Sequence, residues 1–409
     1  MSNHQCALSY PKSELKVLLL EKIAQDAVDM FKKEGFQVEC RDKITEDELV
    51  EIIPSIHILG VRSKTQVTRR VLEASRRLLA VGCFCIGTDQ TDLACAASNG
   101  KVVFNAPFSN TRSVAEMVMG NIIMLLRQIC ERSSECHVGK WNKVASNCYE
   151  ARGKVLGIIG YGHVGSQVSI LAEAFGMIVK YYDHVPKLAL GNASSVDSLN
   201  ELLQISDIVT VHVPLTNETE NMISAKEFAL MKRGSYFLNA ARGTVIDVDA
   251  LAAAVKSGHI AGCAVDVFPH EPASAAEELV TPLRGLPNTI LTPHIGGSTE
   301  EAQAAIGKEV ASKLITFVNT GSTLGAVNMP EMQLPFPANA HRILNFHKNV
   351  PGVLRDINNI LSAYNVRGQM LMTQANEGYL IVDVETHVSD EVKEQIASLP
   401  ASIKTRILY

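Results

Sequence analysis

The sequence of 409 residues has no dense run of lysine or arginine and no long apolar run. Its formal net charge is −5, and without a basic run neither nucleic acid nor an anionic membrane surface is an expected partner. The apolar stretches are short and interrupted, so no segment is predicted to span a bilayer. Residues 1–16 lack a positively charged segment followed by an apolar one, which argues against export.

Cysteine is present without the spacing that a metal site or a disulfide framework needs. The nine cysteines are an odd number in a large chain, and those nearest to a cluster are Cys83, Cys85 and Cys95. No paired histidine follows them, so the spacing is not that of a zinc site. The sequence therefore predicts buried free thiols in a reducing compartment, no metal, and a cytoplasmic location.

Apolar residues make up 46% of the chain and charged residues 20%, a composition that allows large cores and two or three domains. In the first hundred residues, apolar runs at 16–20, 56–61 and 78–81 alternate with a helical segment at 24–34, which Gly35 ends. This alternation predicts an α/β unit with a parallel sheet.

The middle of the chain contains a long helical pattern followed by a second α/β unit. Ser113 and Glu116 have the spacing of a capping box, and residues 114–129 are predicted to form one helix that connects two domains. The second unit opens at about residue 151. Its six predicted strands are 155–159, 178–182, 208–213, 236–239, 261–267 and 289–291. Six strands with crossovers predict a doubly wound, Rossmann-type sheet.

The last part of the chain predicts a separate small domain. Ser298 and Glu301 form a second capping box, before a long helix that reaches about Phe317. A proline-rich linker follows. The tail then predicts strands at 343–346, 366–372, 379–384 and 403–408, with helices at 352–362 and 390–397. This βαββαβ order is ferredoxin-like, and a unit of roughly 70 residues is expected to pair with a copy of itself.

A glycine-rich loop in the second α/β unit predicts a dinucleotide site. Gly160, Gly162 and Gly165 follow an apolar strand and open a helix, and Asp183 lies 18 residues after Gly165, at the end of the next strand. The glycines permit a tight turn and close approach of the backbone to a pyrophosphate. The Asp183 carboxylate can accept hydrogen bonds from a ribose diol and would repel a 2′-phosphate, which favours NAD over NADP.

Three polar residues follow later strands of the same unit. Arg242, Glu271 and His294 each lie at a predicted strand end, where open α/β sheets bind ligands. A guanidinium can hold a substrate carboxylate, and histidine has the unperturbed pKa suited to a general base. A neighbouring carboxylate would orient the imidazole and raise its pKa. Taken singly, a surface ion pair, a solvated loop acid and a turn histidine are the alternatives.

Four segments resemble the D-isomer-specific 2-hydroxyacid dehydrogenases. They are FNAPFSNTRSVAE at 104–116, GIIGYGHVG at 157–165, NAARGT at 239–244 and LTPHIGGS at 291–298. The resemblance covers essentially the whole chain and includes a C-terminal regulatory domain of the ACT type. It implies NAD-dependent oxidation of a phosphorylated 2-hydroxy acid, 3-phospho-D-glycerate, as the first step of serine synthesis.

The resemblance also implies domain boundaries and further site residues. A flavodoxin-like substrate domain would comprise 1–108 and 297–334, the NAD domain 109–296, and the ACT domain 338–409. Residues implied near the substrate, besides Arg242 and His294, are Arg62, Ser63, Asn110 and Lys143, of which Arg62 and Lys143 would meet the phosphate. Residues implied around the cofactor, besides the three glycines, Asp183, Arg242 and His294, are His163, Val164, His212, Val213, Pro214, Ala240, Ala241, Asp266 and Gly297.

In the tail, His347 and Asn349 match the effector positions of serine-inhibited members of this family. At the third position those members carry asparagine, where this chain has Arg367. A guanidinium facing the ammonium of an amino acid would repel it, which predicts weak or altered inhibition by serine. Trp141, the only tryptophan, is expected to anchor an arm on a neighbouring subunit, and the resemblance implies a homotetramer.

Two other functions remain open on the sequence. The same cations would accept the distal carboxylate of a dicarboxylic 2-oxo acid such as 2-oxoglutarate, so the enzyme could be a reductase of that class. An NAD-sensing corepressor uses the same fold to bind peptides and can retain the catalytic residues. The ACT-like tail argues against the corepressor, because such modules bind amino acids.

Overall fold

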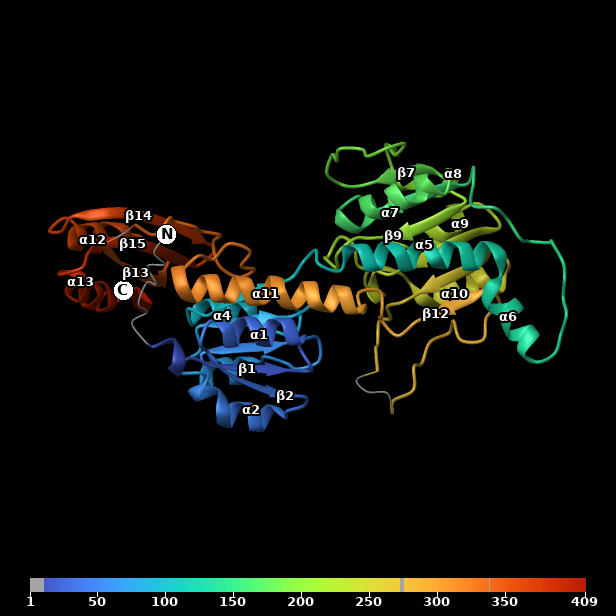
Figure 1. Ribbon diagram of the computed structural model, residues 1–409. Helices are drawn as coiled ribbons and strands as arrows, with labels where there is room; N and C mark the ends of the chain where they lie inside the picture. The colour runs from blue at the N-terminus through green and yellow to red at the C-terminus, as the bar shows by residue number, and fades with distance from the viewer. Residues whose placement is uncertain (1–10, 273–275, 338) are drawn as a thin grey trace. The chain divides into compact units, whose positions relative to one another are not determined.

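The computed structural model describes residues 11–272, 276–337 and 339–409 (Figure 1). The chain divides into two compact units, one formed by Met1–Ser109 with Gln303–Tyr409 and the other by Asn110–Ala302. Two predicted domain boundaries lie outside the described residues: residue 1, the expected start of the substrate domain, and residue 338, the expected start of the ACT domain. Residues 1–10, which begin the segment that lacks an export signal, also lie outside them.

The first unit begins with a five-stranded parallel sheet in the order β2-β1-β3-β4-β5. Its strands are β1 (Lys16–Leu20), β2 (Gln37–Arg41), β3 (Ile58–Val61), β4 (Ala80–Cys83) and β5 (Val102–Asn105). The helices are α1 (Gln25–Lys33), α2 (Glu46–Ile52), α3 (Arg69–Ala74) and α4 (Leu93–Ser98), with short 3₁₀ turns η1 (Lys12–Glu14) and η2 (Ile53–Ser55). The predicted parallel α/β unit is confirmed. The edge strand β2 was not predicted because it is mostly exposed and has no apolar run.

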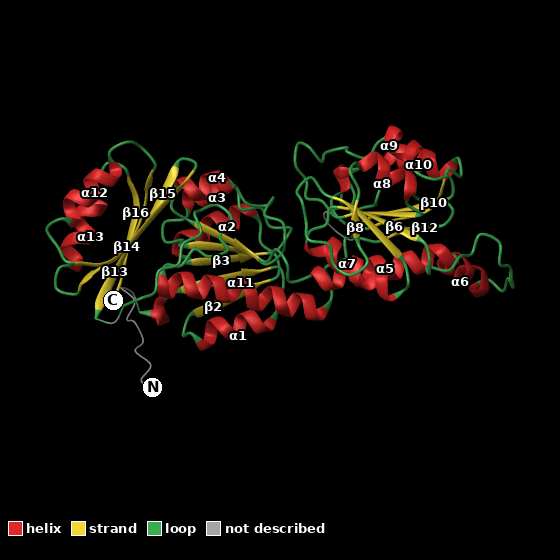
Figure 2. Ribbon diagram, turned by 90° about the horizontal axis from the view of Figure 1, so that it is seen from above, coloured by secondary structure: helices red, strands yellow, loops and turns green. Residues whose placement is uncertain are grey.

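Helix α11 (Glu300–Thr320) returns from the second unit and packs on this sheet beside α1, while α2, α3 and α4 cover the other face (Figure 2). Val310, Leu314 and Phe317 place its apolar side in one core with strand residues of the sheet. The long helix is confirmed, but the predicted cap is not. Thr299, rather than Ser298, accepts a hydrogen bond from the backbone N–H of Ala302, at 3.1 Å.

The second unit contains a seven-stranded parallel sheet in the order β12-β11-β10-β9-β6-β7-β8. Its strands are β6 (Val155–Ile159), β7 (Ile178–Tyr182), β8 (Ser194–Ser195), β9 (Ile208–Val211), β10 (Ser235–Asn239), β11 (Ile260–Val265) and β12 (Thr289–Leu291). The helices are α5 (Thr111–Arg127), α6 (Ile129–His137), α7 (His163–Ala174), α8 (Leu199–Ile205), α9 (Ala225–Leu230) and α10 (Val248–Lys256), with the 3₁₀ turn η3 (Gly243–Val245). Helices cover both faces (Figure 2), so the doubly wound sheet is confirmed, with β8 as an additional two-residue strand.

The long central helix differs from the prediction at both ends. Asn110 is its N-cap, and Ser113 lies inside the first turn with its Oγ 2.8 Å from Thr299 Oγ1, so the predicted capping box is wrong. Gln128 takes a left-handed conformation (φ 52°) and separates α5 from α6. Among the described residues no single helix has the length and apolarity to cross a membrane; only α5 and α6 together, bent by 65°, pass that test.

The C-terminal segment forms a four-stranded antiparallel sheet in the order β14-β15-β13-β16. Its strands are β13 (Ala340–Lys348), β14 (Val366–Gln374), β15 (Glu377–Glu385) and β16 (Ser402–Leu408), and its helices are α12 (Val353–Leu361) and α13 (Ser389–Ala397). Both helices lie on one face (Figure 2) over a core of their own. The predicted βαββαβ order is confirmed. The other face shares a core with the five-stranded sheet and α11.

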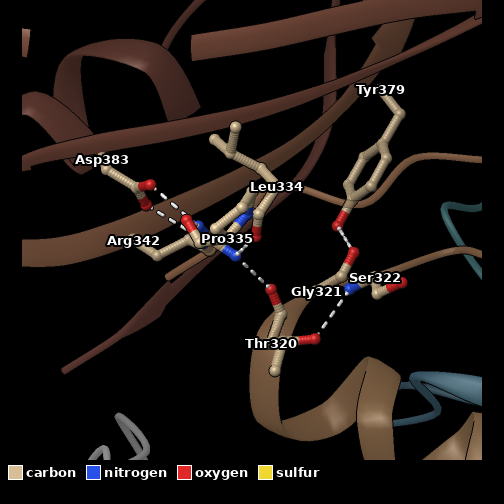
Figure 3. Close-up of polar contacts among 8 residues, drawn as sticks. All are labelled: Thr320, Gly321, Ser322, Leu334, Pro335, Arg342, Tyr379 and Asp383. Carbon is tan, nitrogen blue, oxygen red and sulfur yellow. Dashed lines mark hydrogen bonds and ion pairs between the residues drawn. The ribbon is translucent and has the colours of Figure 1, made fainter. Parts of the chain in front are cut away.

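A buried arginine fixes the end of α11 to this small sheet (Figure 3). Arg342 is fully buried and donates two hydrogen bonds to Asp383, at 2.7 and 2.8 Å. Its remaining donors reach the backbone carbonyls of Thr320, Leu334 and Pro335 at 2.8–2.9 Å. The Tyr379 hydroxyl donates to the carbonyl of Gly321 at 2.6 Å. Carbonyls left unpaired at a helix end are thereby satisfied by side chains of the small sheet.

The cysteines with described positions are all free. Cys83, Cys95 and Cys263 are buried, as the sequence predicts for such thiols. Cys40, Cys130 and Cys136 are exposed, so the prediction of burial is wrong for these three. They lie on the edge strand β2 and on α6, outside the main cores of their units.

Candidate active site

The glycine-rich loop joins β6 to α7, and its three glycines have different surroundings. Gly160 has φ 90°, and a Cβ there would lie 2.6 Å from the carbonyl oxygen of His212. A Cβ on Gly165 would lie 2.2 Å from the carbonyl oxygen of Gly160. At Gly162, the N-cap of α7, a Cβ would meet nothing within 4 Å. The backbone at Gly160 and Gly165 therefore packs too closely against neighbouring backbone for a side chain to fit. The backbone at Gly162 is open, so a ligand can approach it there.

The N-terminal turn of α7 begins with His163 and Val164, so the first N–H groups of the helix and the positive end of its dipole lie at this loop. Asp183 follows β7 and is oriented by the same loop. Its Oδ2 accepts a hydrogen bond from the N–H of Tyr161 at 2.8 Å, and its Oδ1 accepts from the N–H of Val185 at 3.0 Å. The carboxylate therefore stands beside the glycine loop with a fixed orientation.

His212, Val213 and Pro214 follow β9, next to β6 in the sheet. Burial lowers the pKa of His212 to about 3. Its Nε2 lies 2.9 Å from the hydroxyl of Thr210. The ring is consequently neutral at physiological pH and adds no charge beside the glycine loop.

Arg242 follows β10 and is positioned by Asn239 on the same turn. Asn239 Nδ2 donates to the carbonyl of Arg242 at 3.0 Å, and its Oδ1 accepts from the N–H of Ala241 at 3.0 Å. One guanidinium nitrogen of Arg242 donates to the carbonyl of Ala241 at 2.8 Å. The turn that starts at Ala240 thus has a defined shape. Within the described ranges, most of the guanidinium donors have no acceptor.

Asp266 organises the segment that carries His294. Its own backbone carbonyl accepts from the N–H of His294 at 2.8 Å. Its buried carboxylate accepts from the N–H groups of Ile295 and Gly296, each at 2.9 Å, and from the hydroxyl of Thr292 at 2.5 Å. His294 itself has φ 54°, a left-handed conformation that is unfavourable for a residue with a side chain. These contacts hold that conformation in place.

Glu271 and His294 are in direct contact. The Nδ1 of His294 lies 2.8 Å from Oε2 of Glu271, and Oε1 of Glu271 accepts from the N–H of Phe268 at 3.2 Å. The hydrogen bond to Glu271 raises the pKa of His294 against the opposing effect of burial, and the charges of Glu271 and Asp266 act in the same direction. Burial by itself would raise the pKa of Glu271, but the bond and charge of His294 hold it below its ordinary value.

Asn110 and Gly297 are neighbours at the other end of this segment. A Cβ on Gly297 would lie 2.1 Å from Nδ2 of Asn110, so a side chain at position 297 would displace the Asn110 side chain. The Oδ1 of Asn110 is buried, and no hydrogen-bond partner for it is found in the described part of the chain. Buried polar atoms are nearly always paired, so an unpaired carbonyl oxygen here indicates a place for a ligand donor or an ordered water.

The other residues expected near the substrate, Arg62, Ser63 and Lys143, do not lie beside His294 and Asn110 within one unit. Arg62 and Ser63 follow β3 in the other unit. Lys143 lies in the exposed segment after α6, and within the described ranges it forms no hydrogen bond or ion pair.

The three expected effector residues also separate into two places on the small sheet. His347 is buried, burial lowers its pKa, and its ring packs against Gly378. Asn349 donates to the carbonyl of Ala375 at 3.1 Å. Arg367 lies at the other end of the sheet and pairs with Glu385 at 3.6 Å. A single chain therefore does not bring Arg367 to His347 and Asn349.

Asn239 and Thr292, which position Arg242 and Asp266, were not among the predicted site residues. Both occur in the segments 239–244 and 291–298 that carried the resemblance. Their position at strand ends was the available signal, because polar residues there reach the same edge of the sheet as the catalytic candidates.

Comparison with known proteins agrees with this architecture. The family description "D-isomer specific 2-hydroxyacid dehydrogenase, NAD binding domain" matches residues 119–296, and "AHAS small subunit-like ACT domain" matches residues 343–404. The crystal structure of D-lactate dehydrogenase from Aquifex aeolicus complexed with NAD and lactic acid is similar with a TM-score of 0.67 and 28% identity, over 77% of this chain and 100% of that chain.

Full-length relatives are closer in sequence. D-3-phosphoglycerate dehydrogenase of Dictyostelium discoideum is 54% identical over 402 residues, which is 98% of this chain and 99% of the relative. The enzyme of that name from Escherichia coli strain K12 is 48% identical over 408 residues, with 98% and 99% covered. The chain therefore belongs to the D-isomer-specific 2-hydroxyacid dehydrogenase family, and within it to the D-3-phosphoglycerate dehydrogenases with a C-terminal ACT domain.

Proposed function

We propose that this protein oxidises 3-phospho-D-glycerate to 3-phosphohydroxypyruvate with NAD, the first step of L-serine biosynthesis. The observation that carries the proposal is the contact between His294 and Glu271 at the strand ends of a sheet whose glycine loop is built for a dinucleotide. The names of the full-length relatives support the choice of substrate.

The cofactor fits the residues that the second unit presents. The open backbone at Gly162 and the first turn of α7, with His163 and Val164, would hold the pyrophosphate. The Asp183 carboxylate would accept from the ribose diol of NAD and disfavour a 2′-phosphate. His212 to Pro214, Ala240, Ala241, Asp266 and Gly297 surround the same strand ends and are assigned to the nicotinamide side.

Bound NAD supplies the acceptor for the hydride that leaves the hydroxyl-bearing carbon. His294 acts as the general base, because Nδ1 is engaged by Glu271 and Nε2 remains for the hydroxyl proton. Glu271 orients the ring and stabilises the imidazolium that forms. Arg242 holds the substrate carboxylate through the guanidinium donors that the Ala241 carbonyl does not take.

The phosphate end of the substrate requires further cations and donors. We assign Arg62, Ser63, Asn110 and Lys143 to this end, with Arg62 and Lys143 as the charged contacts. The unpaired Oδ1 of Asn110 supports its part in this assignment. The division into a substrate domain (1–108 and 297–334), an NAD domain (109–296) and an ACT domain (338–409) belongs to the same proposal.

One assay tests the proposed reaction against its rivals. NADH production is followed with 3-phosphoglycerate and NAD at mildly alkaline pH, and NADH consumption with 2-oxoglutarate. We expect the first activity to dominate. Activity with 2-oxoglutarate alone would identify a reductase of dicarboxylic 2-oxo acids, and activity in neither direction would leave a corepressor-like binding protein.

We further propose a homotetramer of cytoplasmic location, regulated at the ACT domain by an amino acid. Trp141 is 86% exposed in the single chain, as an anchor for a neighbouring subunit would be. Because Arg367 lies far along the sheet from His347 and Asn349, an effector site made from all three requires two chains. L-Serine should then inhibit weakly, and an inhibition constant in the low micromolar range would refute the assignment of Arg367.

A further inference from the structure

The chain makes an unusual turn immediately after β1, one of the blue strands of the first sheet and labelled in Figure 1. Glu21 and Lys22 have φ values of 63° and 53°, so two successive residues with side chains adopt the left-handed conformation. This region is disfavoured by contacts of the Cβ atom, and surrounding interactions must hold it. The turn lies at the carboxyl end of a parallel sheet, the edge where such folds bind ligands.

The Glu21 side chain supplies those interactions. Its Oε1 accepts hydrogen bonds from the N–H groups of Thr65, at 2.7 Å, and Arg62, at 3.3 Å, and its Oε2 accepts from the N–H of Lys64 at 3.0 Å. Three donors of the loop after β3 therefore converge on one carboxylate 41 to 44 positions earlier in the chain. Charged acceptors make the stronger hydrogen bonds, so this contact shapes the loop.

The same loop is held from its other side by Gln90. The buried Gln90 side chain donates to the backbone carbonyl of Arg62 at 2.6 Å, and the backbone carbonyl of Gln90 accepts from the N–H of Val67 at 2.7 Å. The backbone of Arg62 is thus fixed at its N–H by Glu21 and at its carbonyl by Gln90.

The arrangement leaves the Arg62 guanidinium available. Because both Glu21 oxygens are directed to backbone N–H groups, the carboxylate does not form an ion pair with the guanidinium. Among the described residues, the only hydrogen bond of that group is a long one, 3.5 Å, to the backbone carbonyl of Glu21. A cation with a fixed backbone and unsatisfied donors is suited to bind an anion bidentately.

We propose that Glu21 is a positioning residue for substrate binding, because it fixes the loop that presents Arg62 and Ser63 to the phosphorylated end of the substrate. The inference rests on the proposed function, which assigns Arg62 to the phosphate. Glu21 does not touch the substrate or the cofactor in this role. Its loss therefore affects substrate affinity, while the His294 chemistry and NAD binding, which belong to the other unit, remain intact.

The test compares Glu21→Gln with the wild-type enzyme in initial-rate kinetics. The glutamine side chain has an NH₂ group in place of one carboxylate oxygen. This group cannot accept from a backbone N–H of the loop, so part of the contact between residue 21 and the loop is lost. We expect KM for 3-phosphoglycerate to rise about tenfold, with kcat and the dissociation constant of NADH changed less than about twofold. Glu39→Gln is the matched control, since Glu39 is an exposed glutamate on the same sheet whose side chain pairs with Arg41. Its KM should stay at the wild-type value.

Two further variants distinguish a failure of the role proposed for Glu21 from a failure of the assignment of the loop to the substrate phosphate. Gln90→Met removes the second contact to Arg62 with little change in volume, so it should raise KM even if Glu21→Gln folds poorly. Arg62→Ala must also raise KM if the loop contacts substrate. A rise in Arg62→Ala without a rise in the other two overturns the role of Glu21. No rise in Arg62→Ala overturns the assignment of the loop to the phosphate, whatever Glu21→Gln shows.

Discussion

Replacing Glu271 by glutamine removes the negative charge next to His294 and leaves a side chain of the same size. A hydrogen bond to a charged group contributes roughly 1.5–3 kcal/mol. The side chains of His294 and Glu271 are 49% and 38% exposed, so solvent screening places the contribution at the low end of that range. Since about 1.4 kcal/mol is a factor of ten in rate, kcat/KM for 3-phosphoglycerate should fall roughly tenfold at its plateau.

The pH profile gives a second, independent readout of the same substitution. His294 must be neutral to accept the hydroxyl proton, so oxidation rises with pH through the pKa of this residue. Glu271 raises that pKa, and the rising limb of kcat/KM in the wild type is expected above the ordinary range of histidine. In Glu271→Gln the limb should move to lower pH.

The assay is initial-rate NADH formation from pH 5 to 10 at saturating NAD. Glu278→Gln is the control, because Glu278 is an exposed glutamate of the same unit that pairs with Arg284 on the surface. Its profile should coincide with that of the wild type. If Glu271→Gln leaves both the limb and the plateau unchanged, the coupling between Glu271 and His294 does not operate in catalysis, and the assignment of the base has to be revised.

Three further outcomes are expected. His294→Ala should lower turnover by about 10²- to 10⁴-fold with NADH binding, measured by fluorescence titration, nearly unchanged; a small loss of turnover would exclude it as the base. Asp183→Asn should reduce the ratio of kcat/KM for NAD to that for NADP, and an unchanged ratio would remove Asp183 from ribose recognition. Arg342→Met leaves Asp383 buried without its partner and should cost about 3–5 kcal/mol in urea unfolding; a loss below about 1 kcal/mol would show that the pair contributes little.

Much of the fold was predictable from local patterns. The apolar runs at 16–20, 155–159 and 178–182 became strands with those bounds. The signal is strongest at 16–20 and 155–159, because a strand covered by helices on both faces has to be apolar along most of its length. The exposed edge strand β2 and the two-residue strand β8 carry no such signal, and they were not predicted.

Capping was predicted less well than the helices themselves. The spacing of Ser113 and Glu116 fits a capping box, yet α5 begins at Thr111, and Ser113 contacts Thr299 instead. Local spacing describes one way to satisfy the first N–H groups of a helix. A contact from a segment 186 positions away competes with it and is invisible in that spacing.

At the candidate site, the types of the reactive residues were predictable from the sequence, whereas the contacts that orient them became known only from the fold. Glycines after an apolar strand, and a histidine and an acid at strand ends, mark the chemistry because parallel strands bring their carboxyl ends to one edge. Asp266 holds the His294 segment, and Glu21 holds the Arg62 loop, through hydrogen bonds between residues that are tens of positions apart in the sequence.

The amino-acid sequence by itself determined the order of most helices and of the buried strands, the dinucleotide loop, and the family to which the chain belongs, because these depend on periodicity and short motifs. Only the tertiary structure decided which side chains orient the reactive ones, and that Arg342 fixes the end of α11 to the C-terminal sheet. Hydrogen bonds act over about 3 Å, and distances of that size between remote residues exist only once the chain has folded.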